Sequence, residues 1–152
     1  METKPAIIRY CRYQERCHSE VRNKLYEIGC YTAEVEQLLT ELIEMGLLNE
    51  ERFARAFARG KFRMLQWGRV KIKQELTARK ISEYCIRQGM KEIDEEGYAA
   101  TMQKLVDKKW LELRTERSPA TKKGKLYRYM VQKGYENSII LELLQEKINE
   151  GK

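Results

Sequence analysis

The apolar and charged positions between residues 32 and 45 follow the pattern of an amphipathic helix. Apolar residues recur at helical spacing along one stripe, and acidic residues occupy the opposite side. The stripe consists of Val35, Leu38, Leu39, Leu42 and Met45, and the acidic side of Glu34, Glu36, Glu41 and Glu44. We therefore expect a helix here that buries one face against neighbouring helices and leaves the other in water.

The same pattern occurs three times along the chain, at offsets of 51 and then 54 residues. The equivalent positions are Leu25, Gly29 and Val35 in the first copy, Leu76, Lys80 and Ile86 in the second, and Met130, Gly134 and Ile140 in the third. A copy of about 50 residues is too short to bury a large core alone, so neighbouring copies are expected to share cores. We predict an all-α protein, a tandem array of three three-helix repeats at 1–48, 49–97 and 98–152, elongated or crescent-shaped.

The periodicity of apolar residues, with N-cap residues and helix-ending glycines, divides each repeat into three expected helices. Their ranges are 6–17, 19–28 and 32–45, then 50–65, 68–80 and 82–95, and finally 98–113, 121–133 and 136–149. The candidate N-caps are Ser19, Thr32 and Asn49, and the candidate stops are Gly29, Gly46 and Gly97. Residues 114–125 are expected to form the one long loop, with Ser118 and Pro119 as a cap and first-turn pair.

The composition agrees with a helical protein and also bears on the cellular compartment in which we expect it. Only 2 prolines and 9 glycines interrupt a chain in which 35% of the residues are charged. No signal-peptide core and no apolar run of membrane-spanning length is present, so we expect a cytoplasmic protein without membrane association. The four cysteines show no paired metal-ligand spacing, which predicts free thiols.

The net charge of +7 is concentrated in two blocks that alternate with acidic segments. Residues 51–80 carry 10 basic and 2 acidic side chains, and residues 108–135 carry 9 and 2. Blocks of this kind, one repeat length apart, indicate discrete positive patches on a folded protein rather than a disordered basic tail.

The helix expected at 50–65 carries four arginines at spacings of three and four residues: Arg52, Arg55, Arg59 and Arg63. Like charges at this spacing repel one another, and only Glu51 and Glu75 lie nearby in sequence, so an anionic partner would stabilise the row. A second basic arc on the following helix consists of Arg69, Lys73 and Lys80. Together with Lys61, these residues predict a positive wall for an anionic partner; a solvated helix face is the alternative.

The basic residues of the third repeat lie mainly in and just after the expected loop, and the candidates are Lys122, Lys123, Lys125 and Arg128. Basic loops often follow a phosphate backbone, but a loop kept soluble by its charge has the same composition. Trp67 and Trp110 lie among these blocks. Stacking on unpaired bases is one interpretation of them, and packing between units at helix ends is the favoured one.

No constellation of residues indicates catalysis or metal binding. Cys11 and Cys17 fall on opposite sides of a helix, and His18 is the only histidine. Phosphate-binding glycine loops, nucleophile elbows and a distinct acid–base pair are absent from the sequence. We therefore expect a protein that is not an enzyme and needs no cofactor or metal.

The central repeat resembles a known family. Residues 46–82 read GLLNEERFARAFARGKFRMLQWGRVKIKQELTARKIS. The distinctive phrases are Glu51-Arg52-Phe53-Ala54, Gly68-Arg69 before an aliphatic residue, Glu75-Leu76 two turns later, and the restart at Ile81-Ser82. On these residues the chain resembles the central part of the RecX family of bacterial recombination regulators, and the repeats on either side look like its outer units. Lys80 stands where the turn of that family usually has glycine.

The resemblance implies a monomeric helical protein that binds the RecA filament on single-stranded DNA and suppresses ATP hydrolysis, strand exchange and co-protease activity, and so regulates recombination and the SOS response. The residues alone agree with tandem helical repeats, positive patches and no catalytic site. The alternative is a helix-turn-helix-like protein that binds duplex DNA without RecA, with the basic second helix of the central repeat as its recognition helix.

Overall fold

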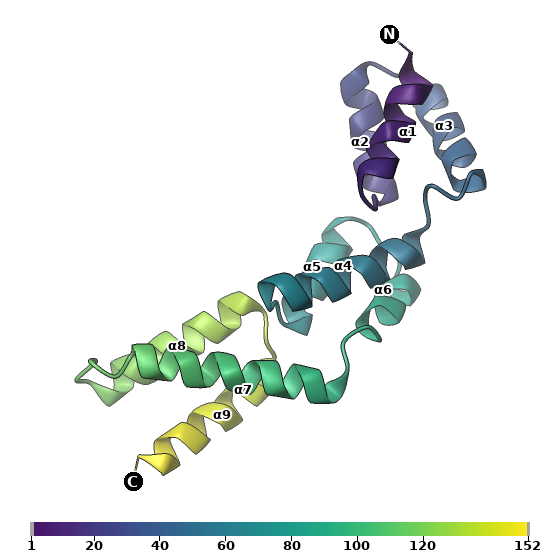
Figure 1. The fold of residues 1–152 in the computed structure, drawn as a ribbon. Coiled ribbons are helices and arrows are strands. Elements are labelled where there is room, and N and C mark those ends of the chain that lie inside the picture. Colours follow the sequence, from purple (N-terminus) through teal and green to yellow (C-terminus); the bar gives the residue numbers. More distant parts are fainter. Residues whose placement is uncertain (1, 152) are drawn as a thin grey trace. The chain divides into compact units, whose positions relative to one another are not determined.

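The computed structural model describes residues 2–151, and within them nine α-helices and no strands are present (Figure 1). The first five helices are α1 (Thr3–Tyr13), α2 (His18–Ile28), α3 (Thr32–Glu44), α4 (Glu50–Leu65) and α5 (Arg69–Ala78). The other four are α6 (Glu83–Met90), α7 (Glu95–Glu112), α8 (Pro119–Lys133) and α9 (Asn137–Glu150). The prediction of an all-α protein is confirmed.

The helices form two compact units whose boundaries differ from those of the predicted repeats. Unit 1 comprises Met1–Ala58 and Glu75–Glu92, and unit 2 comprises Arg59–Gln74 and Ile93–Lys152. Both α4 and α5 therefore begin in one unit and end in the other. The division into repeats at 1–48, 49–97 and 98–152 stays a prediction.

The first three helices contribute a compact core to unit 1, in which α2 packs against both α1 and α3. Its buried residues are Ile7, Cys11, Val21, Leu25, Cys30, Val35, Leu39, Leu42 and Leu48. The predicted stripe on α3 thus supplies three buried residues, whereas Leu38 is half-buried and Met45 at the end of the stripe is exposed.

The ends of α2 and α3 differ from the predicted caps. Ser19 and Thr32 lie inside the helices, whose N-caps are Cys17 and Tyr31. In each case a glutamate in the first turn reaches back. The Glu20 carboxylate accepts from the Cys17 N–H at 3.0 Å, and the Glu34 carboxylate from the Tyr31 N–H at 3.1 Å. The prediction for Asn49 is confirmed, because its side-chain oxygen accepts from the Arg52 N–H at 2.9 Å.

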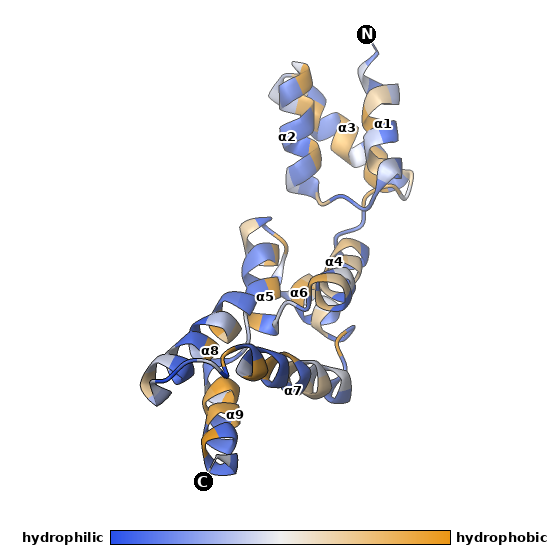
Figure 2. Ribbon diagram, turned by 60° about the vertical axis from the view of Figure 1, so that its left-hand side comes forward, coloured by the Kyte–Doolittle hydropathy of each residue, from blue (hydrophilic) through white to orange (hydrophobic). Residues whose placement is uncertain are grey.

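The third-repeat helices build most of unit 2, with α8 packed against both α7 and α9. Residues that are fully or almost fully buried here include Met102, Leu105, Val106, Leu126, Met130, Ile140 and Leu144. Figure 2 shows α8 as mostly hydrophilic and the first half of α9 as hydrophobic. Each helix nevertheless buries two residues, Leu126 and Met130 on α8 and Ile140 and Leu144 on α9.

Two predicted boundaries in unit 2 are wrong for reasons of capping. The expected loop at 114–125 ends early, because the Ser118 hydroxyl accepts from the Thr121 N–H at 3.3 Å and Pro119 opens α8. Gly97 lies in the first turn of α7 rather than at a stop, because the Asp94 carboxylate accepts its N–H at 3.1 Å. The basic residues expected in a loop therefore lie on a helix.

The turn between α4 and α5, residues 66–68, docks together with the first turn of α5 against the turn between α8 and α9. We call this contact, with the side chains that pack on it, the elbow. The Gly68 N–H donates to the Lys133 carbonyl at 2.7 Å, and the Val70 N–H to the Gly134 carbonyl at 2.9 Å. A Cβ on Gly68 would lie 2.3 Å from the Gly134 oxygen, and Gly134 has a φ of +95°. Only glycine permits this approach at both positions.

Candidate functional site

Arg52 and Arg55 at the start of α4 are paired with carboxylates inside unit 1. The Arg52 guanidinium lies 2.6 Å from a Glu15 oxygen, and that of Arg55 lies 2.9 Å from Glu92 and 3.2 Å from Glu51. These carboxylates raise the pKa of Arg55 above its usual value. The expectation that only Glu51 and Glu75 could relieve repulsion along the row is wrong, because the fold brings in Glu15 and Glu92 from distant parts of the sequence.

Arg69, at the first position of α5, belongs to the elbow. Its guanidinium lies 3.0 Å from Glu95 and 3.6 Å from Glu136, and 4.0 Å from the centre of the Tyr98 ring. The Tyr98 hydroxyl also accepts the Arg69 backbone N–H at 2.9 Å and donates to Glu136. With 17% of its side chain exposed and two carboxylates beside it, Arg69 is not an open member of the predicted positive wall.

Trp67, also in the elbow, is half-buried between two lysines. The Lys61 ammonium lies 5.2 Å and the Lys71 ammonium 4.5 Å from its ring. The ring is not part of the buried core, and the favoured interpretation of Trp67 as a seal between units stays a prediction. Arg59, which is half-buried on α4, also has an interaction partner within the described chain.

Five of the predicted site residues are exposed and, among residues 2–151, make no ion pair: Arg63, Lys73, Lys80, Lys123 and Arg128. Arg63, Lys73, Lys123 and Arg128 belong to unit 2, and Lys80 belongs to unit 1. Lys80 has a φ of +62°, so lysine adopts the left-handed turn conformation in which glycine is ordinary. These side chains have no carboxylate to leave before they meet an anionic partner.

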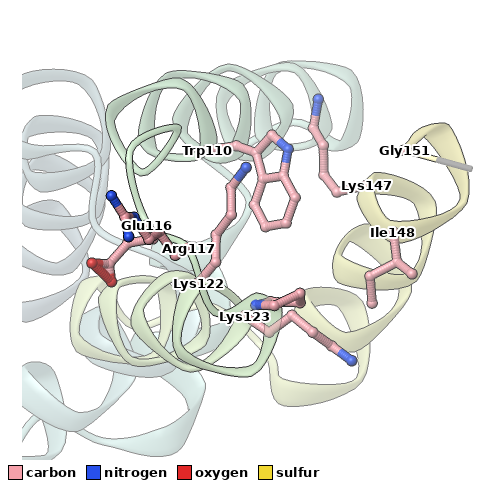
Figure 3. A pocket seen from close by; sticks show the side chains of 9 residues that line it. Trp110, Glu116, Arg117, Lys122, Lys123, Lys147, Ile148 and Gly151 are labelled. Atoms are coloured by element: carbon pink, nitrogen blue, oxygen red, sulfur yellow. The ribbon is translucent and has the colours of Figure 1, made fainter.

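A cavity of 390 Å³ lies at the start of α8 in unit 2 (Figure 3). Its lining includes Trp110 from α7, Lys122 and Lys123 from α8, and Ile148 from α9. The Lys122 ammonium lies 3.9 Å from the centre of the Trp110 ring. The Trp110 ring is half-buried and borders this cavity, and its interpretation as packing between units stays a prediction.

The charges around this cavity are unevenly matched. Lys147 on the lining is held by Asp107 at 2.6 Å and Glu150 at 3.3 Å, and its hydrogen bond lowers the pKa of Asp107. Glu116, also on the lining, pairs with Lys125 at 3.0 Å. Within the described chain, no carboxylate pairs with the other three lining cations, Arg117, Lys122 and Lys123.

Three cations of these surfaces are absent from the predicted site residues: Lys71, Arg117 and Lys147. Lys71 lies on α5, four residues after Trp67 in the preceding turn, so the helical spacing rule does not indicate this contact. Lys147 comes from α9, far along the chain from Trp110. No local signal in the sequence joins it to the cavity.

Other kinds of site find no support in the described part of the chain. Among residues 2–151 no cluster of three or more His, Cys, Asp or Glu could hold a metal ion. The helices of the same residues include none that is both long enough and apolar enough to cross a membrane.

Comparison with known proteins identifies the family. Residues 49–90 match the family model for the second three-helix domain of RecX, and residues 96–144 match the model for the third. The regulatory protein RecX of Clostridium perfringens strain 13 is 30% identical over 155 residues, which cover 99% of this chain and 72% of the relative. This chain belongs to the RecX family. The regulatory protein RecX of Lactococcus lactis subsp. cremoris strain SK11 is also 30% identical, over 97% of this chain and 56% of that relative.

Solved structures agree on the fold of this RecX-family protein. The crystal structure of RecX from Lactobacillus salivarius superposes with a TM-score of 0.79 at 22% identity, covering 94% of this chain and 92% of that one. A second crystal structure of a regulatory protein RecX gives 0.81 at 24% identity, over 94% of this chain and 70% of that one. The prediction of a helical array of three-helix repeats is confirmed, and the family is one of regulatory proteins.

Proposed function

We propose that this protein regulates homologous recombination and the SOS response by binding the RecA filament on single-stranded DNA, and that it inhibits RecA. It acts by binding alone, as a cytoplasmic monomer without cofactor or metal, and is not an enzyme. Membership of a regulatory family supports the general role. The resemblance of residues 46–82 to the central part of RecX names RecA as the partner.

The observation that carries the proposal is that four of the predicted site residues in unit 2 are exposed and make no ion pair among the described residues: Arg63, Lys73, Lys123 and Arg128. A filament on single-stranded DNA offers phosphates and acidic side chains to such residues. Each phosphate contact releases counterions, which favours binding and makes it sensitive to salt. Arg52, Arg55 and Arg69 contribute to the fold instead, because each would have to leave a carboxylate to reach a partner.

The geometry of α5 argues against the alternative of a helix-turn-helix-like protein that acts without RecA. A recognition helix reads base edges with its N-terminal residues, which must be free to enter the major groove. Here the N-terminus of α5 is covered within unit 2, since Gly68 and Val70 donate to the turn after α8 and Arg69 is held by two carboxylates. This arrangement leaves Lys73 as an exposed cation further along the helix.

The test is RecA-dependent ATP hydrolysis on single-stranded DNA, measured with increasing amounts of this protein. The proposal predicts a concentration-dependent fall in the rate and preferential binding to the filament over bare duplex. Unchanged hydrolysis at saturating protein, together with tight sequence-specific binding to duplex DNA, would establish the alternative.

A further inference from the structure

The cavity between α7, α8 and α9 has the properties of a ligand site. Its 390 Å³ falls within the range of about 300–1,000 Å³ that small-molecule sites occupy. Side chains from three helices meet there, and Figure 3 shows the indole of Trp110 between Lys122 from α8 and Lys147 from α9. We propose that this cavity binds one nucleotide unit, with the base against Trp110 and the phosphate on Lys122, Lys123 and Arg117.

The charge of the lining selects a phosphate. Lys147 and Glu116 are each satisfied by partners of their own, so neither contributes an unmatched charge. Arg117, Lys122 and Lys123 have no carboxylate partner among the described residues, and a phosphate monoester carries up to two negative charges at neutral pH. The start of α8 adds the favourable end of the helix dipole on the same side.

The apolar part of the lining selects an aromatic group beside that phosphate. Trp110, Pro119 and Ile148 provide an indole and two aliphatic surfaces, and indole faces stack well on nucleobases. In the free protein the Lys122 ammonium occupies the ring face at 3.9 Å. Because the lysine side chain is flexible, the ammonium can move off the Trp110 ring when a base stacks there, and it can then contact the phosphate.

The inference deepens the proposed function, because it assigns one nucleotide contact within the basic surface of unit 2. The same chemistry has two sources, a free nucleotide or one unit of a single strand. AMP and a short oligodeoxyadenylate distinguish them by which binds at the lower concentration.

The experiment is an NMR titration of the full chain, following the Trp110 indole N–H and the backbone amides of residues 120–123. Trp67→Phe assigns the two indole signals. AMP is expected to shift these resonances saturably, with affinity about tenfold above that of adenosine or inorganic phosphate alone, since neither carries both recognised groups.

Single charge reversals provide the matched control. Lys123→Glu should weaken AMP binding about tenfold, whereas Lys104→Glu, an exposed lysine on α7 outside the lining, should change it less than about twofold. Circular dichroism melting checks that both variants fold. Absence of shifts at Trp110, or equal losses in the two variants, would overturn the inference. Because the titration contains no RecA, its failure leaves the ATPase test untouched, and the reverse also holds.

Discussion

The elbow and the cavity at the start of α8 use the same pair of groups, a cation over an aromatic ring, in opposite ways. At the elbow the Arg69 guanidinium lies 4.0 Å from the Tyr98 ring with Glu95 and Glu136 beside it. At the cavity the Lys122 ammonium lies 3.9 Å from the Trp110 ring without a carboxylate partner among the described residues. The acidic neighbours, not the cation or the ring, separate a structural contact from one that can take a ligand.

The largest expected effect comes from closing the backbone approach at the elbow. Gly68→Ala should destabilise the protein by at least about 2 kcal/mol, because its Cβ would meet the Gly134 carbonyl at 2.3 Å. Gly60→Ala is the control, since a Cβ there meets nothing within 4 Å inside α4. We expect the control to gain about 0.5–1 kcal/mol from helix propensity. Urea denaturation measures both, and a tolerated Gly68→Ala would show that the elbow is loose.

A matched pair of substitutions tests the comparison itself. Arg69→Met should cost about 2 kcal/mol, because it leaves the half-buried Glu136 without its cation and breaks the contact with Tyr98. Lys122→Met should change stability by less than about 0.5 kcal/mol, since no carboxylate loses a partner. Equal costs in thermal or urea unfolding would remove the distinction between the two sites.

Alkaline pH should weaken the elbow. Burial, with the hydrogen bond to Glu136, raises the pKa of Tyr98 above its usual value, and burial raises that of Tyr135. The folded state therefore holds these protons more tightly than the unfolded state. Their contribution is full below about pH 10 and is lost as pH rises beyond that value. Melting temperatures between pH 8 and 11 should fall for the wild type and fall less steeply for Tyr98→Phe.

The smallest expected effect concerns the ion pair between Asp107 and Lys147 beside the cavity, at low pH. The hydrogen bond from Lys147 lowers the pKa of Asp107, so this contribution is present above the ordinary aspartate value and is lost as pH falls below about 4. The pair is partly exposed, so Asp107→Asn should cost less than about 1 kcal/mol. Unfolding at pH 7 and pH 3 should show a smaller difference between variant and wild type at the lower pH.

Local signals in the sequence located the helices well where a cap and a stop coincide with periodicity. The predicted range 50–65 for α4 is confirmed, with Asn49 as its cap. The prediction of Ser118 and Pro119 as a cap and first-turn pair is confirmed, whereas the loop expected at 114–125 is wrong in its end, because α8 begins at Pro119. The N-caps Cys17 and Tyr31 could also have been recognised, because each is followed three residues later by a glutamate that accepts its backbone N–H.

Ion pairing could not be predicted from local sequence. Arg52 and Arg55 each meet a carboxylate 37 residues away, and Arg69 meets Glu136, which directly precedes α9. Such partners depend on how the helices pack, which periodicity does not specify. The sequence therefore shows where basic residues cluster along the chain, but not which of them form ion pairs with carboxylates in the folded protein.

The most direct test of the central claim, that the exposed cations of the predicted basic surface hold the partner, is filament affinity in two equally charged variants. Arg63→Glu with Lys73→Glu reverses two exposed residues of the proposed surface, and Lys91→Glu with Lys104→Glu reverses two exposed lysines outside it. Affinity for RecA filaments on single-stranded DNA should fall about tenfold in the first variant and less than about twofold in the second, with a flatter salt dependence in the first. Equal losses, or wild-type affinity in both variants, would contradict the account.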